Sequence, residues 1–138
     1  MSGIFDKHLL LLSRSLDFRA QRNALLSSNV ANVETPGFKA RDLVFERELG
    51  RAMHAHEPGP LRVTDPRHFD GRTATPLALV KPEVILSATP TTSLDGNTVD
   101  LEKEMAKLGE NQLSYQALTQ MVSHKFSQLK LAIRGEGI

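Results

Sequence analysis

Apolar residues recur at alternating spacings of four and three along both ends of this chain. At the C-terminal end, eight of ten such positions are apolar: Leu101, Met105, Leu108, Gln112, Tyr115, Thr119, Val122, Phe126, Leu129 and Ile133. At the N-terminal end, six of eight are apolar: Leu9, Leu12, Leu16, Arg19, Asn23, Leu26, Val30 and Val33. This spacing is typical of a coiled coil, because it keeps one side of an α-helix apolar. It predicts two long helices, at residues 5–32 and 99–134.

The positions of proline support the same division. All seven prolines lie between Pro36 and Pro90, and proline inside a helix costs about 3 kcal/mol. We therefore expect a mainly α fold in which two long terminal helices form a coiled-coil-like pair and the proline-rich middle is largely irregular. The expected segments are an N-terminal helix with its terminating motif at 1–36, a middle at 37–97, and a C-terminal helix at 98–138.

The middle segment carries two local patterns. Phe45, Leu49 and Met53 lie four residues apart, which predicts a short helix near residues 43–55. Val80 and the apolar run at 84–86 indicate a short strand. The rest is rich in Thr, Ser and Asp and offers little apolar surface to bury, so we expect it to be extended, mobile or ordered only by neighbouring molecules.

The first helix is expected to end at Thr35-Pro36-Gly37-Phe38. A proline at position 36 disfavours the α conformation at Thr35. Pro-Gly at the two central positions of a turn predicts a type II turn, in which Gly37 has positive φ.

Composition excludes several classes of function. The basic and acidic residues are distributed evenly along the 138 residues, and the net charge is only +1. Nothing in this distribution favours binding to nucleic acid or to an anionic membrane. The chain has no cysteine, which removes disulfides and thiol chemistry. No run approaches the roughly 20 apolar residues of a membrane span. The run Leu9–Leu12 is shorter than the roughly 7–15 residues of a signal-peptide core, so no cleaved signal is expected.

The sequence offers no active site. His54 and His56 form a His-x-His pair, but residues two apart on a helix face different sides. Asp65, Asp70 and Glu83 lie in a segment without the fixed geometry that acid–base catalysis needs. We expect no catalytic residue, no cofactor, no metal site and no enzymatic activity.

Both long helices carry more apolar surface than one contact face can use. Additional stripes consist of Leu11, Phe18 and Leu25 in the first helix, and of Leu113, Ala117 and Met121 in the last. An exposed apolar stripe usually marks an interface. Packing between subunits is therefore the preferred interpretation, and a single bundle that closes on the middle segment is the alternative. The polar positions Asn23, Gln112 and Thr119 are either tolerated at an edge or fix the register of the pairing.

The stretch from Ser28 to Lys39 resembles a signature of bacterial flagellar rod, hook and related axial proteins. It consists of Asn-x-x-Asn at a helix end, a short spacer, and Thr-Pro-Gly before an aromatic residue, here Asn29, Asn32, Thr35, Pro36, Gly37 and Phe38. Residues 18–22, 39–43, 64–68, 93–101 and 111–115 resemble a proximal rod member of the family. Another short rod protein is the alternative within it.

The resemblance implies a structural subunit of the flagellar basal body that polymerises through its terminal helices in the periplasmic rod. The expected assembly seam consists of the apolar positions of the two series, from Leu9 to Val30 and from Leu101 to Ile133. The implied partners are copies of the same chain, other rod proteins, an adaptor at the rod base, the membrane ring and the flagellar type III export apparatus. A cytoplasmic coiled-coil chaperone or adaptor would share the helices, but it would not need the Thr-Pro-Gly-Phe turn.

Overall fold

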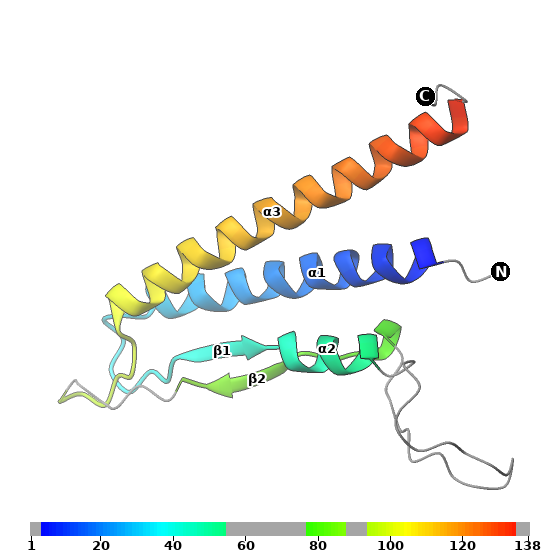
Figure 1. The fold of residues 1–138 in the computed structure, drawn as a ribbon. Helices are drawn as coiled ribbons and strands as arrows, with labels where there is room; N and C mark the ends of the chain where they lie inside the picture. The colour runs from blue at the N-terminus through cyan, green and yellow to red at the C-terminus, as the bar shows by residue number, and fades with distance from the viewer. Residues whose placement is uncertain (1–3, 55–76, 88–93, 135–138) are drawn as a thin grey trace, which may run out of the picture.

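The computed structural model describes residues 4–54, 77–87 and 94–134. These form three layers around the helix α1 (Ile4–Ala31), which lies in the middle (Figure 1). The helix α3 (Leu101–Arg134) covers one side of α1. The strand β1 (Arg41–Val44), the helix α2 (Glu46–His54), the 3-10 turn η1 (Leu77–Leu79) and the strand β2 (Glu83–Leu86) cover the other side.

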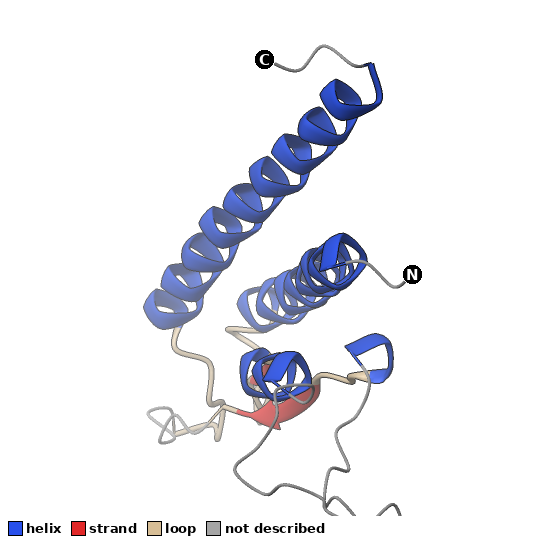
Figure 2. Cartoon of the chain, turned by 45° about the vertical axis from the view of Figure 1, so that its right-hand side comes forward, coloured by secondary structure: helices blue, strands red, loops and turns tan. Residues whose placement is uncertain are grey.

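The two long helices are confirmed, within two residues of the predicted ends. They run antiparallel, lie close together where α1 ends and α3 begins, and diverge toward the N- and C-terminal ends (Figures 1 and 2). The helix α3 begins two residues later than predicted. Asp100 caps it, because its carboxylate Oδ1 accepts a hydrogen bond of 3.2 Å from the backbone N–H of Lys103.

The described part of the middle segment is more regular than predicted. The strands β1 and β2 pair antiparallel, from Arg41 opposite Leu86 to Val44 opposite Glu83. Residues 43 and 44 were expected in a helix, and this is wrong: α2 begins only at Glu46, with the C=O of Phe45 accepting its first hydrogen bond from Leu49. The strand pairing joins residues about 40 positions apart, which local spacing cannot reveal. The remaining expectations for the middle, at 55–76 and 88–93, lie outside the described residues.

The apolar core lies between α1 and the middle segment rather than between the two long helices. Phe18 of α1 is 2% exposed, and its ring centroid lies 5.4 Å from that of Phe45. The core consists of Phe18, Leu43, Phe45, Leu49, Ala52, Leu77 and Val80, with Leu11 and Leu25 packed against it. The second apolar stripe of α1 is therefore covered by the chain's own middle segment. Our assignment of that stripe to packing between subunits is wrong.

Candidate functional site

The motif after α1 forms the predicted turn. Gly37 has a φ of +71°, and the backbone N–H of Phe38 donates to the C=O of Thr35 at 3.3 Å. Nothing lies within 4 Å of the position that a Cβ on Gly37 would occupy. Glycine is therefore favoured here by its backbone conformation and not by lack of space.

Asn97 holds this turn against the start of α3. Its side-chain amide nitrogen lies 3.0, 2.8 and 2.9 Å from the backbone oxygens of Asn32, Val33 and Thr35. These three carbonyls follow the last residue of α1, so this amide supplies a partner to the carbonyls of the turn that ends the helix. Two backbone hydrogen bonds, from Gly37 to Asp95 and from Thr98 to Phe38, fix the same loop. From the sequence, Asn97 stood out within the stretch 93–101 that carries the resemblance, but its contact with the turn after α1 could not be foreseen.

The two asparagines of the signature have different roles. Asn29 is 1% exposed. Its amide donates to the C=O of Arg41 at 2.7 Å and accepts from the N–H of Arg41 at 3.1 Å, as a neighbouring strand would, and it also donates to Glu104 at 2.7 Å. Within the described residues, the side chain of Asn32 makes only local contacts: it donates to the C=O of Ser28 and accepts from the hydroxyl of Thr35. Asn29 therefore joins α1 to both β1 and α3.

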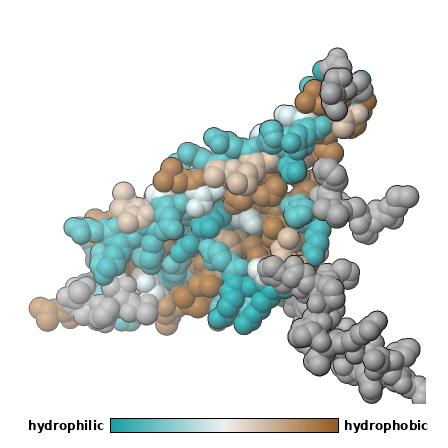
Figure 3. Space-filling model, in the orientation of Figure 1, coloured by the Kyte–Doolittle hydropathy of each residue, from teal (hydrophilic) through white to brown (hydrophobic). Residues whose placement is uncertain are grey.

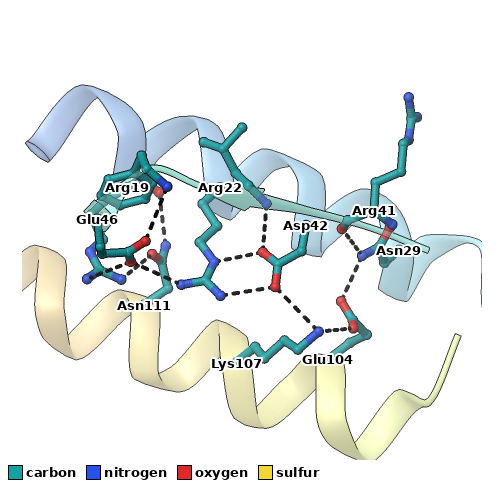
Figure 4. A network of polar contacts seen from close by, with 11 residues as sticks. Arg19, Arg22, Asn29, Arg41, Asp42, Glu46, Glu104, Lys107 and Asn111 are labelled. Atoms are coloured by element: carbon teal, nitrogen blue, oxygen red, sulfur yellow. Dashed lines mark hydrogen bonds and ion pairs between the residues drawn. The ribbon is translucent and has the colours of Figure 1, made fainter. Parts of the chain in front are cut away.

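Polar side chains connect the three layers beside Asn29 (Figure 4). We call this cluster the polar junction; it comprises Arg19, Arg22, Asn29, Asp42, Glu104, Lys107 and Asn111. Arg22 binds the Asp42 carboxylate with two nitrogens, at 2.8 and 3.0 Å. Lys107 of α3 lies 3.5 Å from the same carboxylate and 2.9 Å from Glu104.

Arg19 and Asn111 complete the polar junction at its far side. The amide of Asn111 donates to the backbone C=O of Arg19 at 2.9 Å, and the Arg19 guanidinium donates back to its side-chain oxygen at 3.4 Å. The same guanidinium lies over the ring of Phe45, 5.2 Å from the centroid. At this end, then, hydrogen bonds and charges hold α1 to α3.

The charges of the polar junction shift the pKa of two groups. Burial alone would raise the pKa of the Asp42 carboxyl, but the hydrogen bonds from Arg22 and from the Leu43 amide, with the charges of Arg22 and Lys107, outweigh it and lower the pKa. The hydrogen bond to Asp42 raises the pKa of Arg22. Both side chains are therefore charged at neutral pH.

The predicted assembly seam divides between two environments. In α1, Leu26 is buried and Leu9, Leu12, Leu16 and Val30 are half-buried. In α3, Leu108, Val122 and Leu129 are half-buried, whereas Leu101, Met105, Tyr115, Phe126 and Ile133 are 41–84% exposed. The polar residues Glu104 and Asn111 lie on the side of α3 that meets α1. The spacing of apolar residues therefore misplaced the inward side of α3, because this side is partly polar.

The five exposed residues define what we call the outer face of α3: Leu101, Met105, Tyr115, Phe126 and Ile133. Leu113, Met121 and Leu131 are also at least half exposed, on another side of the helix. Figure 3 shows apolar surface along α3 as far as its C-terminal end. A helix with this much exposed apolar surface is typical of an interface.

The described residues contain no group of three or more His, Cys, Asp or Glu side chains placed to hold a metal ion. No helix in the described ranges is long and apolar enough to cross a membrane. Glu83 lies exposed on β2. Asp65, Asp70 and the side chains of His54 and His56 lie outside what the structure describes.

No protein-family model matches the chain. The flagellar basal body rod protein FlgB of Cereibacter sphaeroides is 41% identical over 138 residues, which cover 99% of this chain and 100% of the relative. The protein of the same name from Aeromonas hydrophila is 39% identical over 136 residues and 99% of both chains. That of Borreliella burgdorferi is 29% identical over 132 residues, or 94% of this chain and 98% of the relative. With matches over nearly its full length in such different bacteria, the chain belongs to the FlgB family of flagellar basal body rod proteins.

Proposed function

We propose that this chain is a non-enzymatic structural subunit of the proximal rod, and that it polymerises through its terminal helices. The observation that carries the proposal is the outer face of α3, where five large apolar side chains are exposed although each lies on a well-formed helix. Leaving such side chains in water forgoes about 25 cal/mol for each Å² of apolar surface. Neighbouring subunits in a rod would recover this free energy.

The polar junction supports the same proposal from the other end of the helices. It holds the start of α3 to α1 and β1 through Glu104, Lys107 and Asn111. Buried polar groups are costly when they lack their partners, so such a cluster favours one arrangement of the elements over others. Each subunit would thus present the outer face of α3 at a defined angle, which a regular polymer requires.

The expected partners follow from this role. They are copies of the chain, other rod proteins, an adaptor at the rod base with the membrane ring beneath it, and the flagellar type III export apparatus that delivers the subunit. The rod segment would lie in the periplasm. The proposed function involves neither contact with nucleic acid nor insertion of the chain into a membrane.

The exposed ring of Phe126 gives a clean test. We expect Phe126→Asp, introduced in place of the native chain in its own bacterium, to abolish swimming and to leave few completed rods. Because Phe126 is 55% exposed, the free energy of unfolding of the monomer should change by less than about 0.5 kcal/mol. Val122→Asp is a poorer probe, because Val122 is half-buried and its loss would also disturb the subunit itself.

Gln128→Asp is the matched control. Gln128 is exposed and lies about 200° around the helix from Phe126. The substitution therefore introduces the same charge as Phe126→Asp, but away from the outer face of α3. Swimming should be retained. Normal rods with Phe126→Asp, or equal loss with both variants, would contradict the proposal that the outer face of α3 is an assembly interface.

A further inference from the structure

We propose that the outer edge of β2 pairs with the same edge of a second copy, so that the two-stranded sheets of two unassembled subunits join into one sheet of four strands. The strand β2 is apolar at Val84, Ile85 and Leu86, which are 53%, 39% and 67% exposed. An exposed apolar edge strand is a template for pairing with another chain. This contact goes beyond the proposed rod function and uses a different surface from the outer face of α3.

Among the described residues, only one edge of the sheet is open to another strand. The strand β1 lies between α1 and β2 (Figure 1). On the α1 side, the N–H and the C=O of Arg41 both bond to the side-chain amide of Asn29, at 3.1 and 2.7 Å. The N–H of Leu43 donates to the carboxylate of Asp42 at 2.8 Å. This edge of β1 is therefore closed, and a further strand can join the sheet only at β2.

The hydrogen-bond pattern of the sheet shows which backbone groups of β2 face outward. The N–H of Ser87 donates to the C=O of Ala40 at 2.8 Å. In an antiparallel pair, hydrogen-bonded residues alternate with residues that are not bonded to the partner strand. Ser87 and Ile85 therefore turn their backbone groups toward β1. Val84 and Leu86 turn their N–H and C=O outward, where these four groups have no partner in the part of the chain that the structure describes.

The outward groups of two copies match each other when the strands run antiparallel and cross at Ile85. Val84 then lies opposite Leu86 of the second copy, and each such pair exchanges two backbone hydrogen bonds. Ile85 lies opposite Ile85 of the second copy, in a pair without hydrogen bonds, where side chains approach most closely. Glu83, the charged residue of the strand, lies opposite Ser87, so like charges do not meet.

Pro82 favours this register over a shifted one. It lies two residues before Val84 and so has the same outward alternation, but proline has no N–H to donate. If the second strand were shifted so that Val84 lay opposite itself, Pro82 would lie opposite Leu86, and the C=O of Leu86 would have no donor. In the register that crosses at Ile85, all four outward groups are paired.

A contact between two identical edges is two-fold symmetric and closes on itself. It therefore produces a dimer of unassembled subunits and no filament, and it covers an edge that would otherwise promote aggregation. The four residues of each β2 bury less surface than the roughly 1,200–2,000 Å² of a stable complex. The dimer should form and dissociate with protein concentration, so that a subunit can leave it to enter the rod.

Disulfide cross-linking of the full chain tests the pairing, because the chain has no cysteine of its own. Opposite residues in a pair without hydrogen bonds have Cα atoms about 4.5 Å apart, which a disulfide can span. Purified Ile85→Cys, oxidised over a series of concentrations, should form a covalent dimer and no larger species. The matched control is Leu79→Cys, which is 65% exposed but lies outside β2. It should give at least tenfold less dimer at the same concentration.

Further variants distinguish strand pairing from random contact between exposed thiols. Val84→Cys should cross-link to Leu86→Cys in a mixture of the two chains, and at least tenfold less to itself. Leu86→Pro, added to Ile85→Cys, removes an outward N–H and should lower the dimer yield at least tenfold. Its helical circular dichroism should be unchanged, because an edge strand tolerates proline on this side. Phe126→Asp, which tests the rod interface, should leave the yield of the Ile85→Cys dimer unchanged.

Equal yields with Ile85→Cys and Leu79→Cys, or an Ile85→Cys chain that stays monomeric at every concentration, would overturn the inference. So would a yield that Leu86→Pro does not lower while the circular dichroism is unchanged. Loss of the dimer with Phe126→Asp would assign the contact to the outer face of α3 and would also overturn it. The proposed rod function stands in each of these cases, because it depends on a different face and is tested by the count of completed rods.

Discussion

Replacing Asn29 with alanine should reveal how strongly one side chain ties the three layers together. The amide of Asn29 makes three hydrogen bonds, two to the backbone of Arg41 and one to the carboxylate of Glu104. A neutral hydrogen bond contributes a net 0.5–1.5 kcal/mol or so, and a bond to a charged group about 1.5–3 kcal/mol. Because Asn29 and Glu104 are each 1% exposed, water cannot easily replace the lost partner. The expected cost is about 3–5 kcal/mol.

Urea unfolding of the purified chain, followed by helical circular dichroism, measures this cost. With an m value of about 2 kcal/mol/M, Asn29→Ala should lower the midpoint by about 2 M. Asn29→Asp should be no milder, because it places a second carboxylate beside Glu104. The matched control is the other signature asparagine, Asn32, because its side chain is half-exposed and makes local contacts with Ser28 and Thr35. Asn32→Ala should cost about 0.5–1 kcal/mol. Equal costs at the two positions would refute the role of Asn29 as the link between layers.

Three further outcomes can be measured. Gly37→Val should lower the free energy of unfolding by about 1–3 kcal/mol and should assemble poorly, because the positive φ at this position disfavours a β-branched residue. Gly37→Ala should be milder and Gly37→Asn milder still. Equal numbers of rods with all three variants would show that the turn only connects the neighbouring segments. The pKa of Asp42 is lowered from its ordinary value of 3.8, so the charged carboxylate stabilises the fold at pH values above 3.8. This stabilisation is lost as the pH falls through the pKa of the folded state. In Asp42→Asn the free energy of unfolding should therefore fall less steeply below about pH 4, and an unchanged pH profile would contradict this prediction. Lys107→Met should cost about 2 kcal/mol because Glu104 loses its cation, whereas Lys103→Met on the solvent side should have little effect in the same denaturation assay.

The long helices and the turn could be predicted from the sequence because their causes are local. Proline is absent from both ends, apolar residues keep a helical spacing, and Pro-Gly sets the turn at Gly37. The strand β1 could not be predicted in the same way. Its partner lies about 40 residues away, and the spacing of Phe45, Leu49 and Met53 extended a helix over residues that pair with β2.

The polar junction could not be predicted from the sequence, for a different reason. Glu104, Lys107 and Asn111 lie on the inward side of α3, where a periodic pattern expects apolar residues, and their partners come from α1 and β1. Five of the eight apolar positions assigned to the contact face of α3 are therefore exposed, and the other three are half-buried. Asn29 was recognised from the sequence only as part of the family motif. Its contacts with Arg41 and Glu104 explain why an asparagine occupies this position. One available signal was that Arg22 and Asp42, which have opposite charges, lie in two of the stretches that carry the resemblance, 18–22 and 39–43.

Hydrogen exchange compared between the dilute monomer and isolated rods tests the central claim most directly. The claim is that the outer face of α3 is uncovered in the single chain and covered by neighbours in the rod. In the monomer, amides at 115–134 should exchange quickly, because few contacts hold the diverging end of α3, while amides at 101–111 are protected by the polar junction. In rods, both stretches should exchange slowly. Strong protection of 115–134 in a proven monomer, unchanged on assembly, would contradict the account.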